Sequence, residues 1–446
     1  MSPTFRALSN HNYRLYAAGG VVSNTGTWMQ RVAQDWLVLQ LTGSGTALGI
    51  TTGLQFLPML LLSPYAGLIA DRFPKRRLLQ VTQLMMAVPA LLLGLLAITG
   101  VVETWHVYAL AFVFGVGTAF DAPARQSFVS EMVTKDDLSN AVGLNSASFN
   151  LARIMGPALA GFMIAGLGGG VQATGWVIAI NALSYAAVVL ALQRMRPWEL
   201  DTPEPQERQK GMIRDGLRYI RSRPDIMMIL AIVFFAGTFG LNFQMTSALM
   251  ATEVFDKGAS EYGILGTTLA VGSLTGALLA ARRGVVRHRL VILAALAFGA
   301  AVVIGGLMPS YLTFALWTPV IGITALTMIT AANTTIQLTV SPALRGRVMA
   351  LYMMIFMGGT PLGAPVVGWV GEVFGARWTL IVGGGVTFLG TLLAVAVFSR
   401  TQGLLDPEVN DPPRLLGLRT RGGAGRGRSR HASSAPSPAS GGVRSR

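Results

Sequence analysis

The chain has 446 residues, of which 52% are hydrophobic and only 12% are charged, and its mean hydropathy is +0.53. Soluble proteins carry about 25% charged residues, so this composition excludes an ordinary globular enzyme. The chain contains no cysteine, which excludes disulfides, thiolate metal sites and cysteine nucleophiles. Its net charge of +15 lies in loops and in the tail, as in membrane proteins with basic cytoplasmic loops, so we expect no nucleic-acid partner.

Apolar segments recur along the chain, and each is long enough to cross a bilayer, which takes about 20 helical residues. Glycine and proline interrupt many of them, which membrane helices tolerate. The sequence therefore predicts an all-α, multi-pass protein of the cell (inner or plasma) membrane with twelve transmembrane helices. In chain order the predicted spans are residues 14–40, 46–70, 78–99, 105–129, 138–167, 174–193, 225–252, 262–281, 288–308, 311–338, 344–371 and 377–399.

The charge of the loops alternates along the chain. Lys75, Arg76 and Arg77 follow the second predicted span, and Arg345 and Arg347 follow the tenth, whereas the intervening loops carry few cations. Because lysine and arginine beside spans collect on the cytoplasmic side, both termini are predicted to be cytoplasmic.

The two halves of the chain carry similar motifs. Gly156-Pro157-Ala-Leu-Ala-Gly161 in the fifth predicted span matches Gly363-Ala-Pro365-Val-Val-Gly368 in the eleventh. This pattern predicts two six-helix parallel repeats. Residues 1–193 would form the N-terminal six-helix bundle and residues 224–400 the C-terminal one.

Residues 194–223 are predicted to be a cytoplasmic linker. Ile213, Leu217 and Ile220 recur at helical spacing beside arginines, which indicates an amphipathic helix on the inner membrane surface. A plain soluble linker helix is the alternative. Residues 401–446, rich in arginine, glycine, serine and proline, are predicted to be a disordered basic tail. For this tail, contact with anionic lipid, RNA binding and no role at all stay open.

The second span ends in Gly67-Leu-Ile-Ala-Asp71-Arg72, followed at once by further cations that include Arg76. A carboxylate at a helix end facing the membrane is costly unless it has a partner or a task. Asp121 and Arg125 lie one turn apart near the same end of the fourth span. Asp71 can pair with Arg125, or accept from the N-terminus of a facing helix. These residues are predicted to form a cytoplasmic gate, with a static clamp as the alternative.

Ionisable residues within the predicted spans concentrate in the N-terminal half. Arg31 and Asp35 form an i, i+4 pair in the outer half of the first span, and Arg153 lies in the fifth. Because burial and nearby charges shift the proton affinity of a carboxylate, we predict proton coupling at Asp35, with Arg31 and Arg153 as its cations and Asp121 as the next candidate. The alternative is a surface pair with no such role.

Amide, methionine and aromatic side chains on several spans are candidates to line a substrate cavity, because such a mixture suits a large, partly apolar ligand. The candidates are Met29, Gln34, Gln55, Asn145, Asn150, Phe235, Asn242, Gln244, Asn333 and Gln337. The chain has no phosphate-cradling loop, and its four histidines show no metal-ligand spacing. We therefore expect no cofactor, no metal and no enzymatic activity.

The run from Gly67 to Arg77 resembles the loop between the second and third helices of the major facilitator superfamily of transporters. The motif with Gly156, Pro157 and Gly161 resembles the antiporter motif of that superfamily, although ordinary small-residue packing would explain the glycines alone. Four further runs resemble the exporter branch that includes the enterobactin exporter and the macrolide-efflux proteins, so that the likeness covers residues 3–400. They are Asn24–Arg31, Asp121–Gln126, Asn145–Arg153 and Gly216–Arg221.

The resemblance implies proton-coupled efflux of an amphipathic drug or siderophore by alternating access. Two departures concern the coupling chemistry: residues 112–120 lack the arginine that many proton-coupled drug exporters carry there, and the loop at residues 281–284 has lost an aspartate. An importer or facilitator on the same fold, and a membrane binding protein without transport, are the alternatives. The expected partners are a small-molecule substrate, protons and the lipid bilayer, and the expected state is a monomer.

Overall fold

The computed structural model describes residues 3–201, 212–281 and 288–398, and in these ranges every regular element is a helix. The predicted tail at residues 401–446 lies outside the described residues, as do part of the linker and the cations Arg282, Arg283 and Arg287. The described helices belong to one compact unit.

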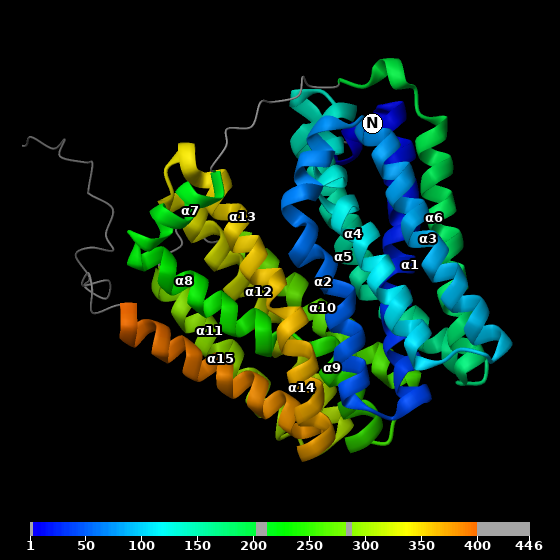
Figure 1. The fold of residues 1–446 in the computed structure, drawn as a ribbon, viewed down its shortest axis with the longest axis vertical. Helices are drawn as coiled ribbons and strands as arrows, with labels where there is room; N and C mark the ends of the chain where they lie inside the picture. The colour runs from blue at the N-terminus through cyan, green and yellow to red at the C-terminus, as the bar shows by residue number, and fades with distance from the viewer. Residues whose placement is uncertain (1–2, 202–211, 282–287, 399–446) are drawn as a thin grey trace, which may run out of the picture. The chain divides into compact units, whose positions relative to one another are not determined.

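Six long helices form the first half of this unit (Figure 1), preceded by the short helix η1 (Pro3–Ser9). They are α1 (His11–Thr42), α2 (Gly45–Arg72), α3 (Lys75–Thr99), α4 (Thr104–Met132), α5 (Lys135–Gly166) and α6 (Val171–Arg194). Two short helices follow, η2 (Pro197–Glu199) and α7 (Met212–Arg221). The second half consists of α8 (Pro224–Phe235), η3 (Ala236–Gly240), α9 (Phe243–Leu249), η4 (Met250–Val254), α10 (Ala259–Ala281), α11 (His288–Gly306), α12 (Tyr311–Thr339), α13 (Pro342–Gly358), α14 (Thr360–Phe374) and α15 (Ala376–Phe398).

Eleven helical segments in the described ranges are long and apolar enough to cross a membrane, counting α8 to η4 and α13 to α14 as one segment each. The sequence predicts twelve. The first predicted span, α1, is 32 residues long but is not among the eleven. Polar side chains in its middle, including Gln30, Gln34 and Asp35, are buried inside the helix bundle instead of facing lipid.

Local chemistry explains where the helices begin and end. At the junction of α1 and α2, Gly43 takes a left-handed φ of 58°, which a glycine adopts at no steric cost. The side chain of Ser44 then accepts a hydrogen bond from the backbone N–H of Ala47 and caps α2. The turn is therefore short, and α1 and α2 run in opposite directions.

Two predicted spans are interrupted in the structure, which the apolar pattern does not reveal. The seventh consists of α8 and α9 with the π-helical turns η3 and η4, and the eleventh is divided into α13 and α14 at Gly359. A Cβ on Gly359 or Gly363 would collide with Thr238 in η3. The backbone of η3 thus packs directly on α14, and small residues make this approach possible.

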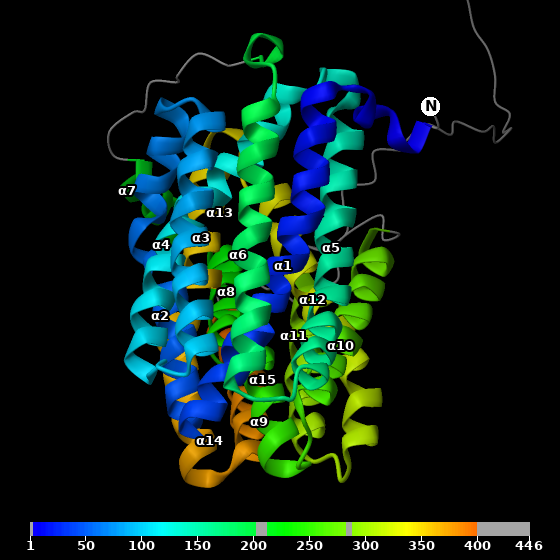
Figure 2. The same cartoon turned by 90° about the vertical axis from the view of Figure 1, so that its right-hand side faces the viewer.

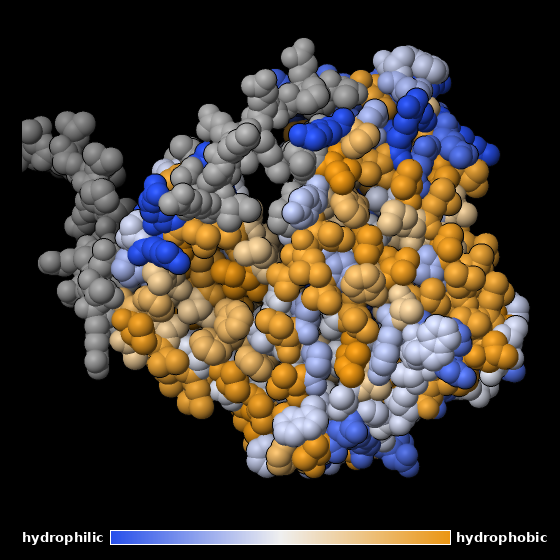
Figure 3. Space-filling view, in the orientation of Figure 1, coloured by the Kyte–Doolittle hydropathy of each residue, from blue (hydrophilic) through white to orange (hydrophobic). Residues whose placement is uncertain are grey.

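The helices α1–α6 gather in one group and α8–α15 in another (Figure 1). We call the end of the unit where α2 meets α3, at Arg72 and Lys75, the basic end; η1 and η2 lie there too. The other end, where α1 meets α2, is the opposite end. Hydrophobic residues cover most of the middle of the visible face, and hydrophilic ones gather toward both ends (Figure 3). This distribution is the one a bilayer-spanning protein requires.

The two groups meet along α2 with α14 and along α5 with α10 (Figure 2). Gly45 and Gly49 of α2 lie so close to the backbone of α14 that a Cβ on either would collide with it, at Gly368 and Ala364 respectively. Gly161 of α5 approaches Ala259 of α10 in the same way. In α2, α5 and α10 these contacts lie on the half of the helix nearer the opposite end. Near the basic end, the space-filling view shows a hollow between the groups (Figure 3).

The helix predicted in the linker is present as α7, and it packs against α13 and α8. Ile220 is buried, whereas Leu217 is 43% exposed. The residues that precede α7, from 202 to 211, lie outside the described ranges. In its described part, the apolar face of α7 thus contributes to the second group of helices.

Candidate functional site

A cavity of about 260 Å³ lies between the two groups of helices. The first group contributes residues of α1, α2 and α5, and the second contributes residues of α9 to α12 and of the turn after η3. Charged side chains enter it only from the first group among the described lining residues: Arg31, Asp35 and Arg153. The second group supplies apolar, amide and hydroxyl side chains.

The guanidinium groups of Arg31 and Arg153 lie over the same indole ring, that of Trp28. Their Cζ atoms are 4.8 Å and 5.7 Å from the ring centroid. The Cζ of Arg31 also lies 5.7 Å from the centroid of Phe56 on α2. Cation–π contacts of this kind stabilise a guanidinium away from water. They hold both cations on one wall of the cavity.

Asp35 has a partner in the other group of helices. The hydroxyl of Tyr262 on α10 donates a hydrogen bond of 2.8 Å to its Oδ2, and both side chains are buried. The ring of Tyr262 stacks on Trp36, with centroids 6.3 Å apart, which fixes its direction. The link therefore joins α1 to α10 across the boundary between the groups.

The predicted pair of Arg31 and Asp35 is not an ion pair in the described structure. Arg31 turns onto Trp28 and Phe56, and its buried Nε has no hydrogen-bond partner. Asp35 turns to Tyr262 instead. Spacing along α1 brings the two residues to the same face, but partners on other helices decide where their side chains point.

Three of the predicted cavity residues, Gln55, Asn242 and Gln244, line the cavity. Gln34 lies behind this lining and donates a hydrogen bond of 3.0 Å to Gln55. Met29 is buried in the helix packing.

The remaining predicted cavity residues are not among those that line the cavity. Phe235 lies against Gly390 of α15. Asn150 donates to the carbonyl of Ser146 within α5, where Asn145 also lies. Gln337 donates to Asn333 within α12.

Asp121 lies outside the cavity, in a polar cluster between α3 and α4. Its Oδ1 accepts hydrogen bonds of 2.8 Å from Thr82 and from Gln83, and its Oδ2 accepts one of 2.9 Å from Nε of Arg125. The carboxylate thus accepts hydrogen bonds from one cation and two neutral donors.

The other predicted gate residues lie near the basic end. Gly67 and Arg72 lie in the last turns of α2, and Arg76 donates a 3.0 Å hydrogen bond to the carbonyl of Leu192. The side chain of Asp71 lies outside the described residues, so its predicted contact with Arg125 is not tested.

One ion pair at this end was not predicted: the buried Lys75 donates to Glu131 of α4. Lys75 was interpreted from the sequence only as one of the cations of the loop, because the apolar pattern gives no sign of a buried partner on α4.

The motif of Gly156, Pro157 and Gly161 lies where α5 meets its neighbours. A Cβ on Gly156 would press on Trp28 of α1, while Pro157 and Gly161 face α10. Gly263 and Gly266 of α10 in turn lie against Pro157. The motif thus allows α5 to approach both α1 and α10 closely.

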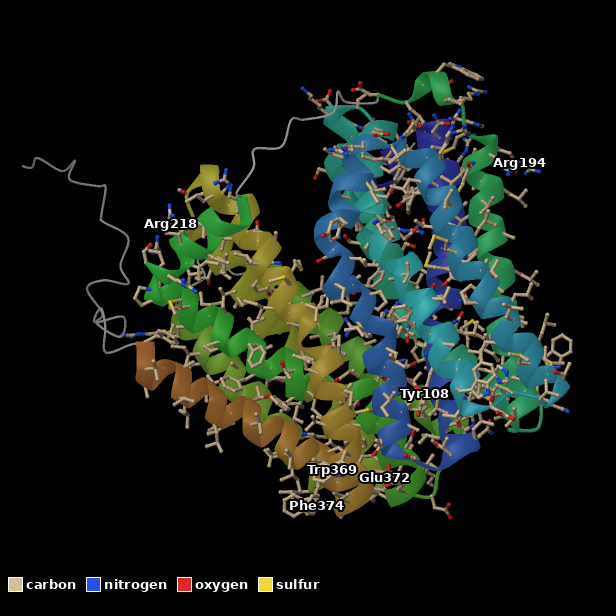
Figure 4. The ribbon with its side chains drawn as sticks, in the orientation of Figure 1. Tyr108, Arg194, Arg218, Trp369, Glu372 and Phe374 are labelled. Atoms are coloured by element: carbon tan, nitrogen blue, oxygen red, sulfur yellow. The ribbon has the colours of Figure 1, made fainter. Side chains whose placement is uncertain are left out.

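At the opposite end, Glu372 of α14 binds the start of α2 (Figure 4). It accepts a hydrogen bond of 2.5 Å from the hydroxyl of Ser44 and one of 3.1 Å from the backbone N–H of Thr46. A carboxylate at a helix N-terminus is favoured by the exposed N–H groups and the helix dipole. Glu372 therefore connects the two groups at the surface.

A bundle of apolar helices in two groups, with a mixed polar and apolar cavity between them, defines a membrane transporter fold. Comparison with known proteins agrees. Residues 2–413 match the model of the transmembrane secretion effector family, and the chain belongs to this family of the major facilitator superfamily. It is accordingly a multi-pass protein of the cell membrane and a transporter by family, not an enzyme. The resemblance predicted from the sequence is thereby confirmed.

The chain is similar to several named transporters over most of their length. The multidrug efflux pump Tap of Mycolicibacterium fortuitum is 28% identical over 82% of this chain and 90% of its own. The staphyloferrin A transporter of Staphylococcus aureus is 24% identical over 82% and 91%. Macrolide efflux protein A of Streptococcus pyogenes is 23% identical over 82% and 91%.

Solved structures share the fold. A bacterial homologue of the human lysosomal transporter Spinster, in an inward-facing and occupied conformation, has a TM-score of 0.68 at 17% identity and covers 93% of this chain and 100% of its own. A D-xylose–proton symporter has a TM-score of 0.69 at 12% identity and covers 86% and 96%. At this level of identity the likeness concerns the fold alone.

Proposed function

We propose that the protein exports an amphipathic small molecule by alternating access and that protons drive the export. The observation that carries this proposal is the cavity between the two groups of helices, whose close glycine contacts at Gly45, Gly49 and Gly161 lie toward the opposite end. If the basic end faces the cytoplasm, as its lysines and arginines indicate, the solute enters from the cytoplasm or the inner leaflet.

The residues of the cavity wall and the names of the relatives both support an amphipathic solute. Apolar residues such as Phe243, Leu269 and Ile321 lie beside amides such as Asn242 and Gln244. Such a wall suits a bulky, partly apolar molecule. The names of the relatives, which refer to multiple drugs, macrolides and staphyloferrin A, favour export of a molecule of this kind over import of a small polar nutrient.

The two matching glycine–proline motifs support alternating access. Pro157 with Gly161 faces α10, and Ala364 with Gly368 faces α2, so that each motif provides one of the two contacts between the groups. This equivalence is what two parallel repeats would produce. Rocking of one group against the other about these contacts would open the opposite end and close the basic end. Arg125 and Asp71 are then the residues proposed to meet as a gate.

Asp35 is the proposed proton site. A hydrogen bond donated to a carboxylate is stronger when the carboxylate is charged, so uptake of a proton by Asp35 would weaken its contact with Tyr262. Arg31 and Arg153 line the same cavity. A proton taken up when the opposite end is open would weaken the link and would leave when the link forms again. Asp121, which has three donors around it, is the second choice.

Transport in oriented vesicles tests the proposal. The protein is reconstituted in one known orientation, a pH gradient of either sign is imposed, and a lipophilic dye is followed. Movement of the dye against the direction of proton flow supports proton-driven export. Movement in the same direction as the protons identifies an importer, and specific binding of the dye without any flux identifies a binding protein; either result overturns the proposal.

A further inference from the structure

Two cations in the cavity, Arg31 and Arg153, form no direct ion pair in the part of the chain that the structure describes. Among the residues that the structure describes, neither Arg31 nor Arg153 forms an ion pair or a hydrogen bond, and the Nε of Arg31 is fully buried without a partner. Burying a charged donor away from water is costly unless an acceptor meets it. Trp28 offers its ring face, but a ring cannot accept the directed hydrogen bonds of two guanidinium groups.

The one carboxylate in the described lining does not satisfy these cations. Asp35 directs its Oδ2 to Tyr262 on the other side of the boundary. With Asp35 charged, the aspartate and the two arginines of the described lining leave one positive charge in the cavity. A single negative charge on a bound molecule would neutralise it.

From this arrangement we propose that the transported solute is an amphipathic anion whose acidic group binds between Arg31 and Arg153. This assignment rests on the proposed transport function and adds the chemical class of the substrate. A carboxylate accepts the paired donors of a guanidinium in a bidentate manner, and Arg31 and Arg153 present such donors from two helices. The apolar body of the molecule then lies against Phe243, Phe298 and Ile321.

The proposal also determines how protons and solute are coupled. A proton on Asp35 makes the cavity more positive, so that a proton and an anion attract each other there instead of competing. Exchange of the proton for the anion must then depend on a difference in conformation. The anion would favour the conformation described here. A proton on Asp35 would disfavour it, because it weakens the link to Tyr262.

Binding of three matched probes tests the proposal at constant pH, without any gradient. Purified protein in nanodiscs of phosphatidylcholine is titrated with dansylglycine, with its uncharged methyl ester and with dansylcadaverine, which carries an amine. We expect the acid to bind about tenfold or more tightly than the ester, because a hydrogen bond to a charged group contributes about 1.5–3 kcal/mol. The amine should bind most weakly.

Variants identify the residues involved. Arg31→Gln and Arg153→Gln should each weaken binding of the acid about tenfold or more and change that of the ester by less than about twofold. Arg→Lys at either position should restore part of the affinity, and Asp35→Asn should tighten binding of the acid. Arg14→Gln is the matched control, because Arg14 is an exposed cation of the same helix and does not line the cavity; it should leave binding unchanged.

Anionic lipid is the other source of a suitable acidic group. Adding phosphatidylglycerol to the nanodiscs should leave the affinity for the acid unchanged if the site is built for a solute. A marked loss of affinity for the acid on adding phosphatidylglycerol, if this effect is absent in Arg153→Gln, would identify a lipid headgroup as the occupant. That result would overturn the solute assignment. Equal affinity for acid and ester, no binding of the acid, or equal effects of the arginine variants on both probes would also overturn it. Because no gradient is used, failure here is separate from failure of proton-driven export.

Discussion

The proposed proton coupling depends on one contact between two side chains, the hydrogen bond from Tyr262 to Asp35. Neither helix predicts this contact by itself, because the sequence pattern of α10 contains nothing that indicates a partner for an aspartate on α1. The tyrosine hydroxyl lies 2.8 Å from the carboxylate because α1 and α10 contact each other across the boundary between the groups. The proposed coupling unit is therefore a pair of residues that only the tertiary structure brings together.

We predict that Asp35→Asn abolishes the response of transport to the pH gradient, because an amide cannot take up and release the proton. Flux in reconstituted vesicles, measured with and without an imposed gradient, should fall to the same value in both conditions. The matched control is Tyr311→Phe, which removes a hydroxyl that donates to the carbonyl of Glu261 within the second group. That variant should respond to the gradient as the parent does, and an Asp35→Asn protein that still responds would remove Asp35 from the coupling.

The ion pair between Lys75 and Glu131 has a structural role in our interpretation. We predict that Lys75→Met destabilises the protein by about 3–5 kcal/mol, because it leaves a buried carboxylate without its cation. The double variant Lys75→Met/Glu131→Leu should recover most of this loss. Thermal unfolding in detergent measures both.

Arg196→Met serves as the reference for this experiment, since it breaks an ion pair whose side chains are 49% and 34% exposed. An exposed ion pair contributes about 1 kcal/mol or less to the free energy of unfolding, so the melting temperature of Arg196→Met should stay close to that of the parent. Equal stability of Lys75→Met and the parent would contradict a structural role for the pair.

At the scale of whole helices, the sequence predicts most of what the structure contains. Length and hydropathy locate eleven segments that qualify as spans, within a few residues of their observed ends. They do not reveal the π-helical turns of α8 to η4, because a π turn depends on the packing of η3 against Gly359 and Gly363. The sequence also does not reveal how each helix is rotated about its axis. It therefore could not distinguish Gln55 and Asn242, which line the cavity, from Asn145 and Gln337, which do not.

Close contact of α5 with α10 is predicted to hold the opposite end shut. Gly161→Val should force these helices apart, because a Cβ at this position meets the backbone of Ala259. Gly143→Val is the control: it lies on the same helix, and a Cβ there meets nothing within 4 Å. Distances between spin labels at the opposite end should lengthen in the first variant alone. Lengthening in both variants would mean that loss of glycine, and not the contact, is responsible.

For the molecule as a whole, alternation requires that the contacts at the opposite end can break. Glu372 connects α14 to the first turn of α2 through Ser44 and Thr46, and it lies at the surface where water can replace it (Figure 4). Such a contact is suited to forming and breaking in each cycle. The buried glycine contacts behind it then determine how far the groups approach.

We predict that Glu372→Gln increases the share of molecules that are open at the opposite end, because the amide binds the hydroxyl and N–H groups of α2 less strongly than the carboxylate does. Pulsed electron resonance between one label on each group measures that share. The chain has no cysteine, so introduced thiols are the only ones labelled. Glu103→Gln, whose carboxylate accepts from Trp105 in its own segment, should behave as the parent. An unchanged distance distribution in Glu372→Gln would exclude this contact as a determinant of the equilibrium.

The ionisable side chains of the cavity come from the first group of helices, apart from the hydroxyl of Tyr262, and most of the apolar and amide wall comes from the second. The charges proposed to couple protons and to bind the acidic group of the solute thus come from one stretch of the chain, and most of the wall that would contact its apolar body comes from another. A substitution in α9 or α12 would then alter which apolar bodies fit without disturbing those charges. Selection by a new toxic compound would then be expected to act first on the second stretch, so that the range of solutes can diverge while the mode of energisation is inherited unchanged.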